Sequence, residues 1–233
     1  MQNFVKLIDR SKLSKLTKRM KNLLIRILLL SLTACGTTQN IKYSVLEKAG
    51  IHKRDILVDR IEKTSEVQEE AKEDFQSAYE RLSELVGVDD AGLESQYKKL
   101  QNAVDVSENR SNELQSRIAS VDSVAKDLFA EWRKELGQYT SANLRRQSEN
   151  NLKMTEQRYA IIYRQMQNSY ARVQPVLQVL QDNTLYLKHN LNARAISGIT
   201  NEVLSVEDKV AQLIVQMENS IRESKQFIDS MGN

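Results

Sequence analysis

Residues that form turns are scarce in this chain of 233 residues, which contains one proline and seven glycines. β-Sandwiches and β-barrels need frequent turns, and Gly and Pro usually supply them. Their scarcity therefore excludes such folds and favours long, uninterrupted helices. With 40% apolar and 28% charged residues, the chain otherwise has the balance of a protein that folds around a core.

Side chains that serve catalysis and metal binding are also scarce. One cysteine cannot form an intrachain disulfide, and two histidines, His52 and His189, provide little for general acid/base catalysis. The chain contains no HExxH, GxxxxGK or GxSxG motif. Ala49 and Tyr186 occupy the positions where a di-iron bundle would carry a Glu three residues before its histidine. We therefore expect no enzymatic activity, no catalytic or metal-binding residues and no cofactor.

Basic residues are concentrated at the N-terminus. Up to Arg26 the chain has eight basic residues and one acid, Asp9, so this segment carries a net charge of +7. The remainder has 26 basic and 30 acidic residues, and its net charge is −4. It contains no block of positive charge suited to the phosphate backbone of a nucleic acid. We expect no nucleic-acid partner.

The one strongly apolar run occupies residues 23–34 and is interrupted by Arg26. A helix that crosses a bilayer needs about 20 apolar residues. This run is shorter, follows basic residues and ends in small ones, which is the pattern of a secretory signal peptide. Met20 is an alternative start that would give a compact leader.

The run ends at Leu32-Thr33-Ala34-Cys35, which resembles the lipobox of bacterial lipoproteins. The resemblance implies that residues 1–34 are removed and that Cys35 carries the lipid that binds the membrane. One acyl chain binds membranes only marginally, whereas two or three anchor a protein stably. In that family a residue other than Asp after the Cys directs sorting to the outer membrane, so Gly36 implies an outer-membrane protein facing the periplasm.

The remaining chain divides into a polar tether at residues 35–50 and a helical domain at 51–233. Apolar or small residues recur every three or four positions in four segments, at about 53–86, 93–136, 144–180 and 203–227. The expected core stripes include Leu57, Ile61, Phe75 and Leu82; Leu100, Leu114, Leu128 and Trp132; Leu152, Tyr159, Met166 and Val173; and Val203, Leu213, Met217 and Ile221. Turns are expected at 87–92, 137–143 and Ser197-Gly198, and Pro175 predicts a kink or break.

Helices with single apolar stripes must pack on one another, and short connections make neighbours antiparallel. The sequence thus predicts an all-α fold, an elongated, coiled-coil-like antiparallel bundle of about four helices. Many Ser, Thr and Ala residues in the stripes also allow a surface that is completed by self-association.

Two polar segments stand out as candidate interaction patches. The first contains His52, Lys53 and Arg54, and the second contains Lys188, His189, Asn192 and Arg194, beside a stripe of Leu187, Leu191 and Ala195. Each is either a polar helix end or a surface that a partner contacts.

These two segments, with Ala71-Lys72-Glu73-Asp74-Phe75 and Leu128-Phe129-Ala130-Glu131-Trp132 between them, resemble the bacterial family called domain of unknown function 2959 (DUF2959). The resemblance implies a helical, lipoprotein-like protein and brings no known activity. Our first hypothesis is a structural or adaptor lipoprotein that contacts an envelope protein, the cell wall or itself. The alternative is a module that binds a small ligand or lipid in a cavity near Pro175, Tyr159, Tyr163 and Tyr170.

Overall fold

The computed structural model describes residues 52–87, 92–191 and 193–232, with the backbone alone at 87, 193–195, 197, 201 and 232. Residues from Lys53 onward form one compact unit. Four long helices make up most of the described chain: α3 (Lys53–Glu84), α4 (Leu93–Glu135), α5 (Ala142–His189) and α6 (Ala193–Gly232). Short 3-10 turns follow α3 at Leu85–Gly87 and α4 at Leu136–Gln138. No strand occurs within the described ranges.

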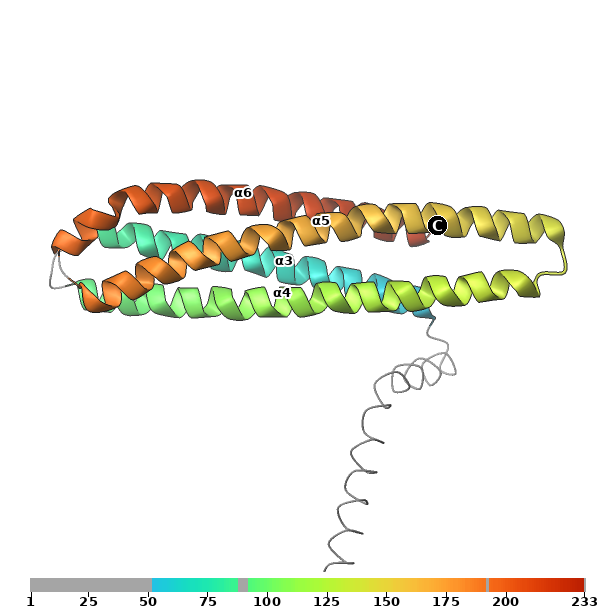
Figure 1. The fold of residues 1–233 in the computed structure, drawn as a ribbon, viewed down its shortest axis with the longest axis horizontal. Helices are drawn as coiled ribbons and strands as arrows, with labels where there is room; N and C mark the ends of the chain where they lie inside the picture. Colours follow the sequence, from blue (N-terminus) through green and yellow to red (C-terminus); the bar gives the residue numbers. More distant parts are fainter. Residues whose placement is uncertain (1–51, 88–91, 192, 233) are drawn as a thin grey trace, which may run out of the picture. The chain divides into compact units, whose positions relative to one another are not determined.

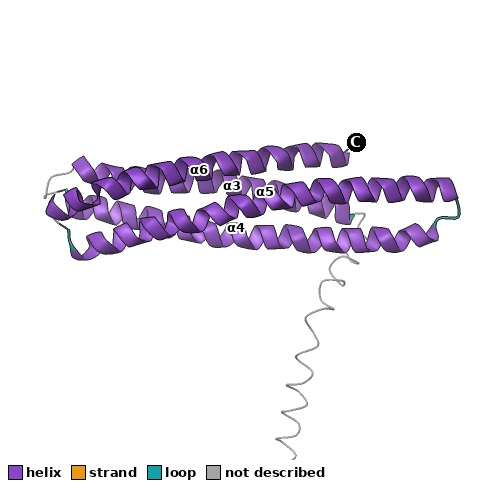
Figure 2. Cartoon of the chain, turned by 45° about the horizontal axis from the view of Figure 1, so that its top comes forward, coloured by secondary structure: helices purple, strands orange, loops and turns teal. Residues whose placement is uncertain are grey.

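The four helices form an antiparallel bundle with neighbours in the order α3, α4, α5 and α6. Helix α3 packs against α4 and α6, and α5 packs against the same two helices, while α3 and α5 lie diagonally opposite. Figures 1 and 2 show this elongated arrangement, with α3–α4 and α5–α6 joined at one end and α4–α5 at the other. The predicted all-α antiparallel bundle of four helices is confirmed.

The core consists of the apolar stripes that the 3-4 spacing predicts. Leu57, Ile61, Phe75 and Leu82 of α3 are completely buried, as are Leu100 and Leu114 of α4 and Met166 of α5. In the C-terminal parts of α4 and α6 the buried positions differ from the predicted stripes. There Phe129 and Ser220 are buried, whereas Trp132 and Ile221 are only half-buried. In α4 the shift arises because seven residues of a straight helix fall about 20° short of two full turns. In α6 the buried positions Met217, Ser220 and Ser224 keep the alternating 3-4 spacing, so the predicted stripe was misplaced at Ile221.

The third helix differs from the prediction at two places. Helix α5 runs through Pro175 without a break, and Figure 1 shows it curving gently along its length. Pro175 lies on the exposed side of α5, where water can hydrate the carbonyl that loses its helical partner. The predicted break is therefore wrong.

The connection between α5 and α6 lies at residues 190–192, earlier than the predicted turn at Ser197-Gly198. Asn190 ends α5, with its backbone N–H bonded to the Leu187 carbonyl and its side-chain amide bonded to the Tyr186 carbonyl. Helix α6 already includes Gly198, whose Cα faces the Tyr186 hydroxyl; a Cβ there would meet that oxygen at 3.7 Å. The stripe predicted through Leu187, Leu191 and Ala195 is thus interrupted by the turn.

A buried polar layer crosses the middle of the bundle. Gln68 of α3 donates through Nε2 to Ser169 Oγ of α5 at 2.7 Å and to Ser220 Oγ of α6 at 3.0 Å. Ser169 in turn donates to the Met166 carbonyl, and all three side chains are fully buried. Because a register shift would leave these groups without partners in the core, the layer favours one alignment of three helices.

Candidate functional site

Several residues of the expected sites lie outside the described residues. Cys35 and the whole apolar run before it are among them, as are the tether and Asn192. Of Arg194, only the backbone within α6 is described. The lipidation site at Cys35 therefore stays a prediction from the sequence.

The two polar segments belong to opposite ends of the bundle. Lys53 and Arg54 begin α3, and the Lys53 ammonium lies 2.8 Å from the Glu131 carboxylate near the end of α4. Lys188 and His189 end α5, at the other end of the unit. His52 directly precedes α3. Lys53 and Arg54 thus do not form one patch with Lys188 and His189, and each segment forms a polar helix end.

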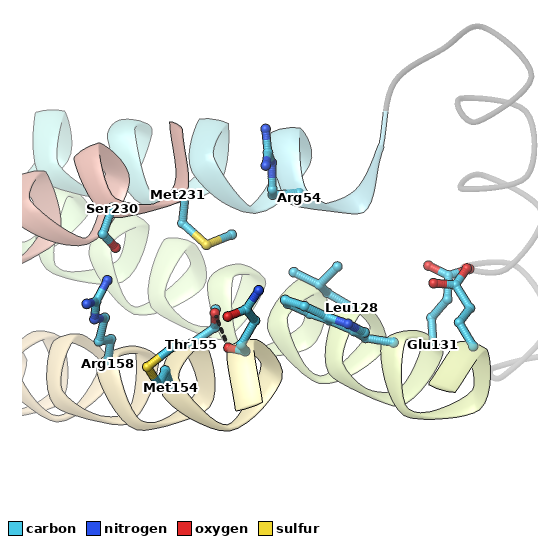
Figure 3. A pocket seen from close by; sticks show the side chains of 11 residues that line it. Arg54, Leu128, Glu131, Met154, Thr155, Arg158, Ser230 and Met231 are labelled. Carbon is cyan, nitrogen blue, oxygen red and sulfur yellow. Dashed lines mark hydrogen bonds between the residues drawn. The ribbon is translucent and has the colours of Figure 1, made fainter. Parts of the chain in front are cut away.

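An open hollow of about 600 Å³ lies where α3 begins and α6 ends. All four helices contribute to it, through Arg54, Leu128, Glu131, Trp132, Glu135, Asn151, Met154, Thr155, Arg158, Ser230 and Met231. Figure 3 shows Met231 extending from α6 toward the space above Met154 and Thr155. Trp132, the only tryptophan, donates its indole N–H to Ser148 Oγ at 2.8 Å. The walls combine thioether, indole and guanidinium groups, which suits an amphipathic molecule.

A second hollow of about 330 Å³ lies between α5 and α6 on the other side of Arg158. It shares Arg158 and Ser230 with the first hollow and is further lined by Ile162 and Phe227. Within the described chain Arg158 forms no ion pair, so its guanidinium is available to an anion at the border of both hollows.

Of the tyrosines that suggested a cavity near Pro175, Tyr159 belongs to the core, whereas Tyr163 and Tyr170 are half-buried. Tyr159 is 8% exposed, and its ring centroid lies 5.5 Å from Phe129 and 6.4 Å from Phe227. Tyr163 stacks on it at 5.7 Å. Burial raises the pKa of the Tyr159 phenol, and the nearby Asp122 carboxylate raises it further. The first hollow lies closer to the α4–α5 connection than to Pro175, and the second is lined by Arg158, Ile161 and Ile162 of α5, about midway between the two.

The α4–α5 connection projects beyond the other two helices. In Figure 1 both helices extend past the end of α6 and past the start of α3. We call residues 133–153 the hairpin tip. None of residues 142–151 is buried, because only α4 is available to cover this part of α5. Sequence periodicity did not identify the tip, since apolar residues continue there at helical spacing.

Among the described residues, no three His, Cys, Asp or Glu side chains are grouped so as to hold a metal ion. Nor does any described helix combine the length and hydropathy that crossing a membrane requires.

The described part of the chain is therefore an antiparallel four-helix bundle. Residues 42–231 match the model of the family of proteins of unknown function DUF2959. The chain belongs to this family, as its sequence predicted. A search of curated proteins finds no match.

Proposed function

We propose that this protein is a bacterial lipoprotein whose helical domain acts as a non-enzymatic structural or adaptor rod in the cell envelope. The observation that carries the proposal is Leu32-Thr33-Ala34-Cys35 at the end of an apolar run too short to span a bilayer. Lipid on Cys35 would anchor the chain, and Gly36 favours the outer membrane and the periplasmic side.

The dimensions of the bundle support a role as a rod. Helix α5 has 48 residues, which corresponds to a length of about 72 Å at 1.5 Å per residue. A lipid-anchored bundle of that length can contact an envelope protein, the cell wall or a second copy at a distance from the membrane. The surface of the helices, rich in solvated ion pairs such as Glu94–Lys98, offers many polar contacts for such a partner.

The experiment that tests the anchor is the intact mass of the protein extracted from bacterial membranes, compared with a Cys35→Ser variant. We expect a mass equal to the chain from Cys35 onward plus acyl chains, and loss of both the added mass and the membrane association in the variant. An unmodified chain that retains residues 1–34 would overturn the lipoprotein proposal.

The adaptor role is tested by cross-linking the acylated protein in intact cells. We expect a defined cross-linked species, either with an envelope protein, with peptidoglycan or with a second copy, and the same species from independent cross-linkers. A strictly monomeric protein that captures nothing at any position along the rod would overturn this role.

A second candidate function, the binding of a small amphipathic ligand or lipid in the periplasm, is favoured by the hollow beside Trp132. Met154 and Met231 provide apolar walls, and the guanidinium of Arg158 is available for a carboxylate or phosphate. Native mass spectrometry of protein extracted from its own membrane tests this function. A bound species that is lost in Arg158→Ala would support it, and a ligand-free protein with unchanged Trp132 fluorescence on lipid addition would exclude it.

A further inference from the structure

The hairpin tip combines exposed apolar groups with positive charge. Tyr139 is 42% exposed and Leu144 is 53% exposed. Residues 133–153 contain five basic and two acidic residues. Arg145 and Arg146, in the first turn of α5, are exposed and form no ion pair within the described part of the chain.

The opposite end of the bundle carries the opposite charge. The described residues 80–87, 92–99, 182–191 and 196–208, around the ends of α3 and α5 and the starts of α4 and α6, include seven acidic and four basic residues. The bundle therefore has an electrostatic polarity along its axis. Near an anionic surface, this polarity favours an orientation with the tip toward the surface and the acidic end away from it.

The start of the helical unit lies at the end that carries the tip. Lys53 pairs with Glu131, only two residues before the tip begins. Four further residues of α4 and the 3-10 turn Leu136–Gln138 extend beyond this pair, which corresponds to about 12 Å. Seventeen residues, 36–52, separate Lys53 from Cys35. Extended, they span about 56 Å, so a chain anchored at Cys35 can bring the tip to the same membrane.

We propose that the hairpin tip is a docking surface for anionic phospholipid, which holds the rod upright on its membrane. The Tyr139 ring and the Leu144 side chain would lie at the level of the headgroups, where amphipathic and apolar side chains are favoured. Arg145 and Arg146 would contact lipid phosphates, as basic residues do at an anionic surface. The role in the cell rests on the proposed lipid anchor at Cys35, whereas the affinity of the tip for lipid is a separate property.

The test uses the chain from Cys35 onward, which contains the whole compact unit, coupled through its only thiol to a maleimide lipid in vesicles. Hydrogen exchange of residues 136–146 is compared on phosphatidylcholine vesicles and on vesicles that also contain phosphatidylglycerol. We expect exchange at the tip to be about tenfold slower on the anionic vesicles, and unchanged at the far connection near residues 190–192.

Two matched variants make the test specific. Arg145→Glu with Arg146→Glu reverses two exposed charges at the tip and should abolish the protection. Lys98→Glu with Lys99→Glu reverses two exposed charges near the far end and should leave the protection intact, although it also breaks the exposed Lys98–Glu94 ion pair. Circular dichroism and thermal unfolding verify that both variants are folded.

The proposal is overturned if exchange at the tip is equal on both kinds of vesicle, or if protection survives the reversal at Arg145 and Arg146. Protection that appears on neutral vesicles and increases with protein density would instead identify a second copy as the occupant. Because the coupling is chemical, these outcomes do not depend on natural acylation. An unmodified Cys35 in the cell would contradict the proposed lipid anchor. Absence of protection at the tip would contradict only the proposed docking surface and would not affect the proposed anchor.

Discussion

The four-helix body and the hairpin tip are built from the same two helices, α4 and α5, yet their side chains meet different surroundings. In the body, Val173 and Leu180 of α5 are completely buried because α4 and α6 cover them. At the tip, Leu144 has similar chemistry and is 53% exposed. Apolar residues at helical spacing therefore form a core only where enough helices pack together to cover them. Where they do not, the same pattern leaves a surface available for contacts outside the chain.

Truncation of a core side chain should give the largest difference between the two regions. Phe75→Ala removes a fully buried ring and should lower the free energy of unfolding by about 3–5 kcal/mol. Leu144→Ala at the tip should lower it by less than about 0.5 kcal/mol. Urea unfolding followed by circular dichroism measures both. Equal losses would show that the tip is as tightly packed as the body.

The buried polar layer should be the next most sensitive part of the body. Gln68→Leu leaves the hydroxyls of Ser169 and Ser220 in the core without their amide partner, at a cost of about 2 kcal/mol. Adding Ser169→Ala and Ser220→Ala removes the unpaired groups, so the triple variant should regain most of the loss. Denaturant unfolding of the three proteins tests this order. A triple variant less stable than Gln68→Leu would contradict it.

The aromatic cluster around Tyr159, where the body approaches the tip, should make the free energy of unfolding depend on pH in the alkaline range. The folded state raises the pKa of Tyr159, first through burial and then through Asp122, whereas the unfolded tyrosine ionises near pH 10. The unfolded state therefore releases a proton that the folded state keeps. Unfolding free energy should fall above about pH 10, by about 1.4 kcal/mol per pH unit from this group.

Tyr159→Phe removes this contribution, so its unfolding free energy should depend less steeply on pH between 10 and 11 than that of the wild type. Below pH 9 both proteins should show parallel profiles, offset by no more than about 1 kcal/mol because the bond to Asp122 is long, at 3.4 Å. Urea titrations across this range make the comparison. Parallel profiles above pH 10 would refute the assignment to Tyr159.

The smallest effect should be a local one at the base of the tip. Trp132→Phe removes the indole N–H that bonds Ser148 and joins α4 to α5. Hydrogen exchange should accelerate at residues 142–150, while the melting temperature of the body changes by only a few degrees. A matching acceleration throughout α3 would mean that tip and body unfold as one unit.

The interaction patches show what sequence reasoning could and could not supply. From the sequence alone, Lys53, Arg54, Lys188 and His189 were predicted to lie either at polar helix ends or on surfaces that a partner contacts, because charge and turn signals are local. Their separation to opposite ends of the unit depends on how the helices fold back on each other. The hollow beside Trp132 was missed for the same reason, since its walls come from four helices distant in sequence.

The sequence predicted the turn between α5 and α6 at Ser197-Gly198 instead of at residues 190–192, because packing between helices outweighed the local preference of these two residues for a turn. Ser197-Gly198 has the composition of a turn, but α6 packs against α5 there, and a glycine inside a packed helix costs only about 1 kcal/mol. Pro175 was likewise tolerated within α5, because it lies on the exposed side.

Periodicity and short motifs are properties of neighbouring residues, so the helical class, most of the apolar stripes and the family could be predicted from the sequence. The lipid anchor at Cys35 stays a prediction. The folded arrangement of the helices was needed to establish which helices are neighbours, which polar groups meet in the layer around Gln68, and which part of the hairpin is left uncovered. Those features arise from contacts between residues 16 to 152 positions apart, such as Trp132 with Ser148 and Gln68 with Ser220. The spacing of residues along one helix does not specify such contacts.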